Sequence, residues 1–504
     1  MRRALVVAGA AAIAAVAVTV PTNAATTRSA STLCVGGGGC YSTLQAALDA
    51  SHDGDTVKVN PGTFAGGVTI AKSVSVVGAG AAKTIIKGGG PVVTIFRDVD
   101  SAGLTVSIKG VAITGGVNRG GEVNFGGGIE IPNTQVDCPP CNGTGATVTI
   151  ADSAITNNVV SAPTALPANN GFCGPRPCAF DSGGGIDNGG VLTVLNTRVT
   201  GNTAGSAPSF PSLASGVFAG GINNHFTGTL VLKRSVVSGN HAAATAPNGQ
   251  FVDTGGINSL GVLSIDDSMV SDNSAEVTAA LPADQGWASS GSGGIHVGEC
   301  CDTASTATIR NTIVHGNRVV ARNTDPAGVS NAFAGGIDVD GQLVLERSVV
   351  SGNSVTSLSA GNAIADAGGL EVDGNATIRD SVVAQNSVVA QAAGGAFAFG
   401  GGIANIGQLT VEHTQVFGNT VSATGSGGQV NGFQSSVRGG GIWNASFFGD
   451  GTPTLTLTNT NIVHNSITGP GSLLVQGGGL YTEFPVTKTG TLISANKPDQ
   501  CFGC

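Results

Sequence analysis

A motif of Gly-Gly followed by Ile or Leu recurs ten times along the chain and limits the possible folds more than any other feature. Its apolar residues are Ile129, Ile186, Ile222, Ile257, Ile295, Ile337, Leu370, Ile403, Ile442 and Leu480. Each copy leads to an Asn: Asn158, Asn202, Asn240, Asn273, Asn317, Asn353, Asn386, Asn419, Asn465 and Asn496. In six copies the separation is sixteen residues. Repeats of this kind stack, because one unit cannot bury its own apolar face.

Positions counted back from each Asn keep the same character in every repeat. The third residue before the Asn is always Ile or Val, and the fifth is always Ser or Thr. The alternation of apolar and polar residues predicts strands. The clearest unit, residues 335–353, divides into three short strands separated by turns. Strands of successive units pair in parallel at ~4.8 Å per coil, and the Asn column predicts an internal amide ladder.

One charged column supports this stacking. The residues seven positions before the Asn alternate in sign through six consecutive repeats: Lys233, Asp266, Arg310, Glu346, Arg379 and Glu412. Opposite charges attract across neighbouring strands, whereas like charges repel. We interpret the column as a device that fixes the register of the coils and not as a site.

Composition agrees with an all-β solenoid, a right-handed parallel β-helix. Gly accounts for 81 of 504 residues, aromatic residues for 4% and charged residues for 11%. Low charge with ample hydrophobicity excludes disorder, and the absence of a three-residue Gly period excludes collagen. Residues 42–51 carry a capping box before an amphipathic stretch, which predicts a short helix covering the open first coil.

The N-terminus is typical of an exported protein. Arg2 and Arg3 precede an apolar run that ends in small residues near Ala24, so we expect residues 1–24 to be a cleaved signal peptide. We divide the rest into a cap with the first coils (25–125) and the repeat coils with a closing coil (126–504). Without Arg2 and Arg3 the chain has 20 basic and 31 acidic residues, a net charge of −11. Nucleic acid is therefore excluded as a partner, no later segment could span a membrane, and we expect a monomer.

Ten cysteines fall into five short-range couples, which predicts local disulfides in an oxidising compartment. The couples are Cys34 with Cys40, Cys138 with Cys141, Cys173 with Cys178, Cys300 with Cys301, and Cys501 with Cys504. A structural zinc site at Cys138 and Cys141 would need a second cysteine couple or a His pair at ligand spacing, and the sequence has neither. The adjacent Cys300 and Cys301 would require a strained bridge, and the sequence leaves it open whether they form one.

The segments after each Asn vary in length, are rich in small residues and carry a late aromatic residue. These aromatic residues are Phe180, Phe218, Phe251, Trp287, Phe333, Phe399 and Phe433. We predict loops that line up along one edge of the solenoid. They either form a binding wall or merely pack down through an aromatic ladder.

Three features of the sequence resemble known families. Residues 44–64, L-Q-A-A-L-D-A-S-H-D-G-D-T-V-K-V-N-P-G-T-F, resemble the opening of pectin-lyase-like β-helix proteins, including pectin methylesterases. The G-G-G-I and G-N repeats are similar to those of bacterial surface proteins and the chlamydial polymorphic outer membrane proteins. N-K-P-D-Q-C, residues 496–501, resembles the close of secreted bacterial members. The resemblance covers residues 40–504 and implies the fold, which hosts many functions.

The sequence departs from these families where their chemistry is located. It has no G-Y-Q-D-T of pectin methylesterases, no W-I-D-H of pectate lyases and no N-T-D with G-H-G of polygalacturonases. No catalytic residue can therefore be transferred. The chlamydial proteins also carry a C-terminal membrane barrel, which we do not expect after the last coil of this chain.

The residue after each apolar anchor is predicted to face solvent and to carry the candidate site. His296, Asp338 and Glu371 occupy this column on three successive coils, and Asp340 and Asp373 follow two residues later. Three interpretations compete. Asp338, Asp340, Glu371 and Asp373 could bind Ca²⁺, or His296, Asp338 and Glu371 could perform acid/base catalysis on a polysaccharide. The third is an acidic strip that only aids solubility.

The same column offers a set of residues suited to sugar binding, namely Asn223, Asn258, Trp443 and Tyr481. Our first functional hypothesis is a secreted or cell-surface protein that binds extended polysaccharide or a cell-envelope component, or acts in adhesion. The alternative is a polysaccharide lyase or glycoside hydrolase. Its substrate would be a glycan, with or without uronic acid. No cofactor other than Ca²⁺ is indicated.

Overall fold

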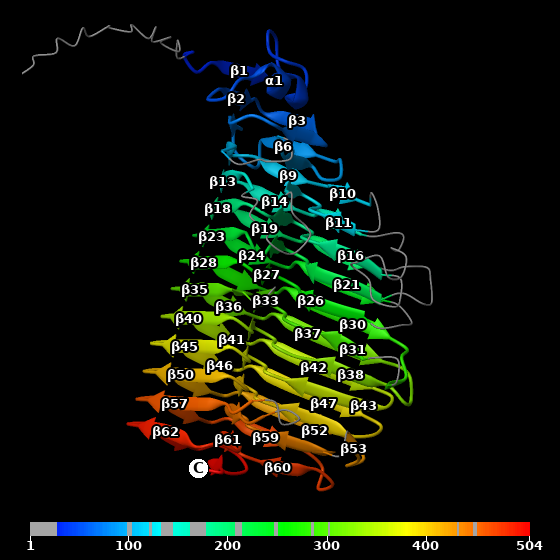
Figure 1. Ribbon diagram of the computed structural model, residues 1–504, viewed down its shortest axis with the longest axis vertical. Coiled ribbons are helices and arrows are strands. Elements are labelled where there is room, and N and C mark those ends of the chain that lie inside the picture. The colour runs from blue at the N-terminus through cyan, green and yellow to red at the C-terminus, as the bar shows by residue number, and fades with distance from the viewer. Residues whose placement is uncertain are drawn as a thin grey trace, which may run out of the picture.

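The chain is a right-handed parallel β-helix whose coils stack along one axis (Figure 1). The computed structural model describes residues 28–97, 103–119, 123–132, 145–161, 178–206, 214–245, 250–283, 287–300, 303–430, 433–446 and 451–504. The predicted signal peptide lies outside these residues. Within them, no helix is long and apolar enough to cross a membrane.

One repeat shows how a coil is built. It runs through five strands: β39 (Ile337–Val339), β40 (Gln342–Glu346), β41 (Val349–Ser351), β42 (Ser354–Ser359) and β43 (Asn362–Asp366). The next coil then begins with β44 (Leu370–Val372). Each strand pairs in parallel with its counterpart one coil away, as β39 does with β44.

The stacked strands form five main sheets, which we name A to E. Their bounds are given by their first and last strands in the described chain. Sheet A has fourteen strands, from β1 (Thr32–Val35) to β62 (Val486–Thr489); sheet B has thirteen, from β3 (Gly62–Ala65) to β63 (Leu492–Ser494); sheet C has thirteen, from β4 (Val68–Ile70) to β64 (Cys501–Phe502); sheet D has ten, from β10 (Val117–Asn118) to β59 (Ser466–Thr468); sheet E has ten, from β11 (Val123–Phe125) to β60 (Leu474–Gln476).

The prediction of loops after each Asn is wrong, because these segments form sheets D and E. In Figure 1 they stand at the right of the stack, opposite the ends of sheet A. Their period of two is carried by small residues: in β30 (Ser274–Ala279) the buried positions are Ala275, Val277 and Ala279. Alanine contributes little to an apolar pattern, so the strands resemble a small-residue loop in the sequence. Sheets A, B and C enclose an Ile, Val and Leu core, whereas sheets D and E enclose a second core dominated by Ala and Val.

The predicted amide ladder is confirmed. The Asn353 side-chain amide donates to Asn386 Oδ1 at 3.0 Å, and Asn317 donates to Asn353 Oδ1 at 3.0 Å. The same bond links each Asn from Asn158 to Asn496 to the next. Every Asn also donates to a backbone carbonyl of the preceding coil, as Asn353 does to Val314 at 3.1 Å. Buried amides are thereby satisfied within the turn.

The Gly-Gly pair is required by the close approach of neighbouring coils. A Cβ at Gly336 would lie 2.5 Å from the carbonyl oxygen of Gly369 and 3.0 Å from the Asn353 amide nitrogen. Backbone atoms of the next coil cannot move aside without breaking the ladder. The motif therefore marks the corner at which sheet E ends and sheet C begins.

Four of the six alternating charges, Arg310, Glu346, Arg379 and Glu412, form ion pairs along sheet A as predicted. Glu346 accepts from Arg310 Nε at 2.8 Å, and Arg379 Nε lies 3.2 Å from Glu412. The hydrogen bond from Arg310 holds the pKa of Glu346 below its usual value. The column also stands in register, since Arg310, Glu346 and Arg379 are direct partners on neighbouring strands.

Reversing one charge in this column should weaken the stack modestly. Glu346→Lys would place a cation between Arg310 and Arg379, and we expect the free energy of unfolding to fall by about 1–2 kcal/mol. Guanidinium or urea unfolding at low and high salt measures this loss. Because salt screens exposed charges, the loss should shrink at high salt. A loss that is independent of salt would contradict the electrostatic origin.

The N-terminal end is closed by the predicted helix, α1 (Leu44–Ala50). Its N-cap is Thr43, whose hydroxyl accepts from the Ala46 backbone N–H at 3.2 Å. Leu44, Ala47 and Leu48 pack into the first core. The helix therefore covers the apolar end of the stack, as the sequence predicts.

The disulfide prediction is confirmed at the two ends of the described chain and untested between them. The bridges Cys34–Cys40 and Cys501–Cys504 are present. The other three predicted couples each include at least one cysteine outside the described residues, so their bridges stay predictions. These couples are Cys138 with Cys141, both outside; Cys173 with Cys178, of which Cys173 is outside; and Cys300 with Cys301, of which Cys301 is outside.

Candidate active site

The candidate site lies in the angle between sheets E and C, which meet at the Gly-Gly corner. Asp366 ends β43 of sheet E, and Glu371 is the central residue of β44 in sheet C. The prediction that the column after the apolar anchor faces solvent is wrong. Asn258, His296, Asp338 and Glu371 are all buried, because sheet E, which the sequence analysis takes for loops, stands beside them.

A cavity of about 250 Å³ opens between the two sheets. Its lining comes from both: Trp287, Asn331, Phe333, Ile364 and Asp366 lie on or beside sheet E strands, and Glu371, Asp373 and Ile406 lie on or beside sheet C strands. The relevant sheet E strands are β31 (Ala288–Ser290), β38 (Val329–Ala332) and β43. The walls are aromatic or aliphatic, and the polar groups are chiefly carboxyls. A small number of polar groups on apolar walls is typical of a ligand site.

Two carboxyl groups in this cavity have buried oxygens that lack hydrogen-bond partners in the described chain. They are Glu371 Oε2 and Asp366 Oδ1, on residues that are 7% and 6% exposed. Burial raises the pKa of Glu371 well above its usual value, and the nearby carboxyls of Asp366 and Asp373 add to the shift. Burial and Asp373 likewise raise the pKa of Asp366 well above its usual value.

Asp373 differs from these two because it lies at the exposed rim. Removal of water by the surrounding protein, with repulsion from Asp340, raises its pKa to about 6. At neutral pH Asp373 is therefore mainly ionised, whereas Glu371 and Asp366 keep their protons to a pH well above that of an ordinary carboxyl. The cavity thus combines carboxyls in different surroundings.

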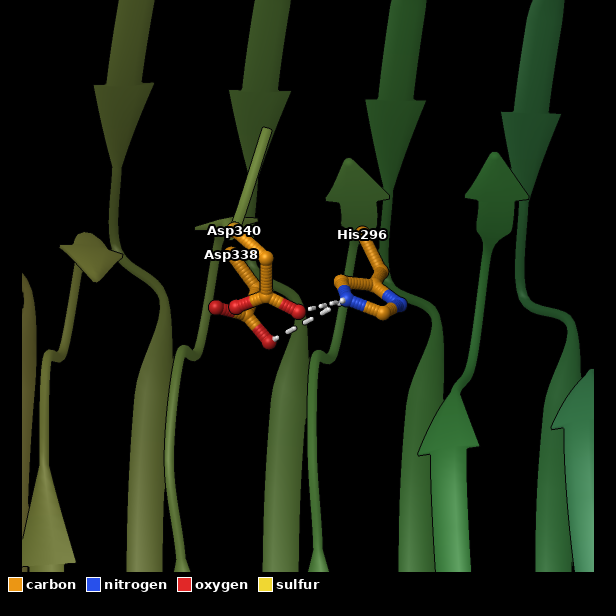
Figure 2. Close-up of side chains that lie close together, drawn as sticks. All are labelled: His296, Asp338 and Asp340. Atoms are coloured by element: carbon orange, nitrogen blue, oxygen red, sulfur yellow. Dashed lines mark hydrogen bonds and ion pairs between the residues drawn. The ribbon is translucent and has the colours of Figure 1, made fainter. Parts of the chain in front are cut away.

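His296 serves as the cation of this cluster (Figure 2). Its Nε2 lies 3.1 Å from Asp340 and 3.9 Å from Asp338, and its Nδ1 lies 2.9 Å from Asp253. Both nitrogens face oxygen acceptors, so both carry protons. Burial opposes this charge, yet the acidic side chains of Asp253, Asp340 and Asp338 outweigh it and raise the pKa of His296 well above its usual value. Burial also raises the pKa of Asp338 well above its usual value.

A chain of amides continues from His296 toward the N-terminal coils. Asn258 accepts from His296 Nδ1 at 3.0 Å and donates to Asn223 at 2.8 Å. Asn223 in turn donates to Asp187 at 3.0 Å, and Asp187 pairs with His225 at 2.8 Å. The amides of Asn223 and Asn258, predicted to bind sugar, therefore make their hydrogen bonds within the protein. They connect the His225–Asp187 pair to His296 and its acidic partners.

The other two predicted sugar ligands lie at the C-terminal end of the same column. Trp443 is buried and stacks on Phe399, with ring centroids 5.0 Å apart. Tyr481 is buried, stacks on Phe502 at 5.3 Å and donates to Glu483 at 2.7 Å. These contacts belong to an apolar cluster that fills the angle between sheets E and C at this end. The structure does not bring these two rings to the cavity that contains Glu371.

The comparisons with known proteins give a distant match. No protein-family model matches the chain, and no curated protein matches it. Among solved structures it is similar to the A-module of the mannuronan C-5 epimerase AlgE6 from Azotobacter vinelandii. That alignment has 15% identity and a TM-score of 0.31, and it covers 90% of this chain and 94% of the other. The site is therefore interpreted from its own residues.

The predicted Ca²⁺ ligands are only partly grouped. Among the described residues, His296, Asp338 and Asp340 offer ligand atoms within 4.8 Å of one another, and this group includes neither Glu371 nor Asp373. His296 would have to lose a proton before it could bind a metal ion. The ion pairs of Figure 2 already compensate Asp338 and Asp340, and Ca²⁺ binding stays a prediction.

Sequence reasoning missed the half of the site that sheet E contributes. Asp253, Phe333 and Asp366 all stand four residues before the apolar anchor of their Gly-Gly motif. A comparison of this position across the repeats predicts that Asp253, Phe333 and Asp366 lie beside the column of His296 and Glu371. The signal is present in the sequence, but it lies in segments whose small residues resemble loops.

The buried acids should make the fold more stable at mildly acidic pH. The pKa values of Glu371 and Asp366 are raised in the folded state, so the folded state binds their protons more tightly and loses stability as pH rises. The raised pKa of His296 acts in the same direction. We expect the free energy of unfolding to increase by a few kcal/mol from about pH 8 to about pH 5.

Chemical unfolding across this range measures the effect. The double variant with Asp366→Asn and Glu371→Gln should be more stable than the wild type at about pH 8 and should show a weaker pH dependence. A stability that is flat, or that falls toward pH 5 in the wild type, would contradict the assigned protonation states.

Proposed function

We propose that the chain is a secreted glycoside hydrolase that acts on a polysaccharide at the cavity between sheets E and C. The single observation that carries the proposal is the pair of buried carboxyl groups, Asp366 and Glu371, whose oxygens line a cavity without a protein partner in the described chain. Burying such a group costs stability. A buried carboxyl group without a protein partner is therefore expected chiefly where the chemistry of a site needs a protonated acid.

The chemistry follows from the different surroundings of the carboxyls. Glu371, whose pKa burial raises well above its usual value, would donate its proton to the glycosidic oxygen as the sugar leaves. Asp373, with a pKa of about 6, is ionised and would act on the sugar from the cavity rim, as base or nucleophile. Two carboxyls with separated pKa values are what glycoside hydrolysis uses. Trp287 and Phe333 offer flat apolar faces for a sugar ring.

The remaining charged residues would position this pair. The cation of His296 compensates Asp253, Asp338 and Asp340. Its charge keeps the adjacent acidic cluster together without entering the cavity lining. Carboxyls of different pKa beside one another match the needs of hydrolysis, so we favour hydrolysis over the first sequence hypothesis. Export is supported by the N-terminal sequence and by the disulfide Cys34–Cys40.

A panel assay tests the proposal. The wild type and Glu371→Gln are incubated with neutral, amine-bearing and uronic-acid polysaccharides, and new reducing ends and unsaturated products are both followed. We expect reducing ends without unsaturation on at least one glycan, and loss of this activity in the variant. Unsaturated products would indicate a lyase and overturn the proposal. Binding without turnover on every glycan would return the chain to a binding role.

A further inference from the structure

We propose that the glycan bound in this cavity carries amine groups, as in a glucosamine polymer, and is not a polyuronate. The inference rests on the proposed function and names its substrate class. It depends on the balance of charge in the angle between sheets E and C and on the side chains that have no partner there.

Carboxyl groups surround the cavity on both sides. Asp366 and Glu371 line it, Asp373 lies at its rim, and Asp338 and Asp340 are close enough to affect Glu371. None of the described lining residues is Lys or Arg. A sugar carboxylate entering this space would meet several acids and no cation among these lining residues, which opposes binding of a polyuronate.

The nearby cations are already engaged. His296 is held on both nitrogens by Asp253, Asp338 and Asp340. Arg438, farther along the angle, lies 3.3 Å from Glu483 and stacks over the Tyr481 ring at 4.7 Å. Neither is placed to receive an anionic sugar in the cavity.

The unpartnered oxygens indicate what the cavity accepts. Glu371 Oε2 and Asp366 Oδ1 have no hydrogen-bond partner within the described chain, although their residues are 7% and 6% exposed. An ammonium group supplies three donors and a positive charge, which satisfies both oxygens and offsets the surrounding acids. Trp287 and Phe333 also favour a cation above their faces. A sugar ring, unlike a lysine side chain, would cover these flat walls as well.

Calorimetry with short oligosaccharides tests this inference without requiring turnover. The ligands are a glucosamine oligomer, its fully N-acetylated counterpart, an oligogalacturonate with and without Ca²⁺, and a lysine oligopeptide. We expect the glucosamine oligomer to bind at least about tenfold more tightly than the N-acetylated one, the contribution of about one charge pair. Its affinity should fall as salt rises.

Variants locate the binding. Asp373→Asn, which removes the ionised carboxylate at the rim, should weaken glucosamine binding by about tenfold or more. Glu371→Gln, which replaces one acceptor oxygen of the cavity by an NH₂ donor, should weaken it by a smaller factor. The matched control Glu276→Gln, which removes an acid beside Arg318 on sheet D, should leave it unchanged. Equal affinity for the N-acetylated oligomer, or binding of oligogalacturonate with or without Ca²⁺, would overturn the inference. So would a lysine oligopeptide that binds as tightly.

The outcomes separate this inference from the proposed function. Hydrolysis of a neutral glycan with no preference for amines would overturn the inference and leave the hydrolase proposal standing. Amine-dependent binding without hydrolysis of any glycan would overturn the hydrolase proposal and leave the inference about the amine standing.

Discussion

Replacing Asn353 with alanine is expected to lower the free energy of unfolding by about 3–6 kcal/mol, because several buried polar groups would lose a partner together and each such loss costs about 1–3 kcal/mol. The fully buried Asn353 side chain accepts from the backbone and side-chain N–H groups of Asn317, both at 3.0 Å. It also donates to Val314 and Asn386. Among substitutions at single positions, we expect few to have a larger effect.

Two comparisons isolate the ladder as the cause. Asn375→Ala removes an exposed Asn from β45 (Asn375–Arg379) on sheet A, and it should change stability by less than about 0.5 kcal/mol. Asn353→Asp keeps the shape and the oxygen that accepts both bonds from Asn317 but can no longer donate when ionised. It should be nearly as destabilising as the alanine variant at neutral pH and should recover in part at acidic pH. A loss below about 1 kcal/mol for Asn353→Ala would show that the ladder contributes little.

Replacing Glu371 with glutamine is expected to lower hydrolysis by about 10²–10⁴-fold, the usual contribution of a general acid. The amide keeps the shape of the side chain but cannot donate an acidic proton. The same change should raise stability at neutral pH, by about 1 kcal/mol or more, because it removes an ionisable group that is buried without a partner in the described chain. Activity and stability therefore move in opposite directions.

Loss of activity with a gain of stability distinguishes a catalytic role of Glu371 from a structural one. A variant that loses activity because it unfolds would lose stability as well, and that result would contradict the assigned role. Glu276→Gln is the matched control, because it makes the same chemical change at a position on sheet D outside the site. It should alter neither hydrolysis nor stability by more than the error of measurement. Activity and unfolding are measured on the same preparations.

Much of the fold could be predicted because stacking repeats the same chemistry in every coil. The Asn column, the Ser/Thr column and the alternating charges each have one role, and each is visible as a period in the sequence. The core strands of sheets A, B and C use Ile, Val and Leu, so their alternation is clear. Sheets D and E use Ala at many of these positions, as in β30, and their strands could not be distinguished from polar loops by hydrophobicity.

The prediction of loops in place of sheet E explains why the site residues were wrongly predicted to face solvent. With sheet E taken for loops, Glu371 and His296 are expected to lie on an open surface. With sheet E in place, they are buried beside Asp366 and Asp253, and burial changes their protonation. A solvated acidic strip and a cavity with protonated acids share the same residues in sheet C. The difference lies in the neighbouring sheet, which the apolar pattern does not report.

The crystal structure of the Glu371→Gln variant with bound oligosaccharide tests the central claim most directly. Crystals are grown with a glucosamine oligomer and, separately, with its N-acetylated counterpart. We predict a sugar ring between Trp287 and Phe333, with a glycosidic oxygen at residue 371 and, in the first crystal, an amine near Asp366 or Asp373. A cavity that stays empty while the oligosaccharide binds another face of the solenoid would contradict the account.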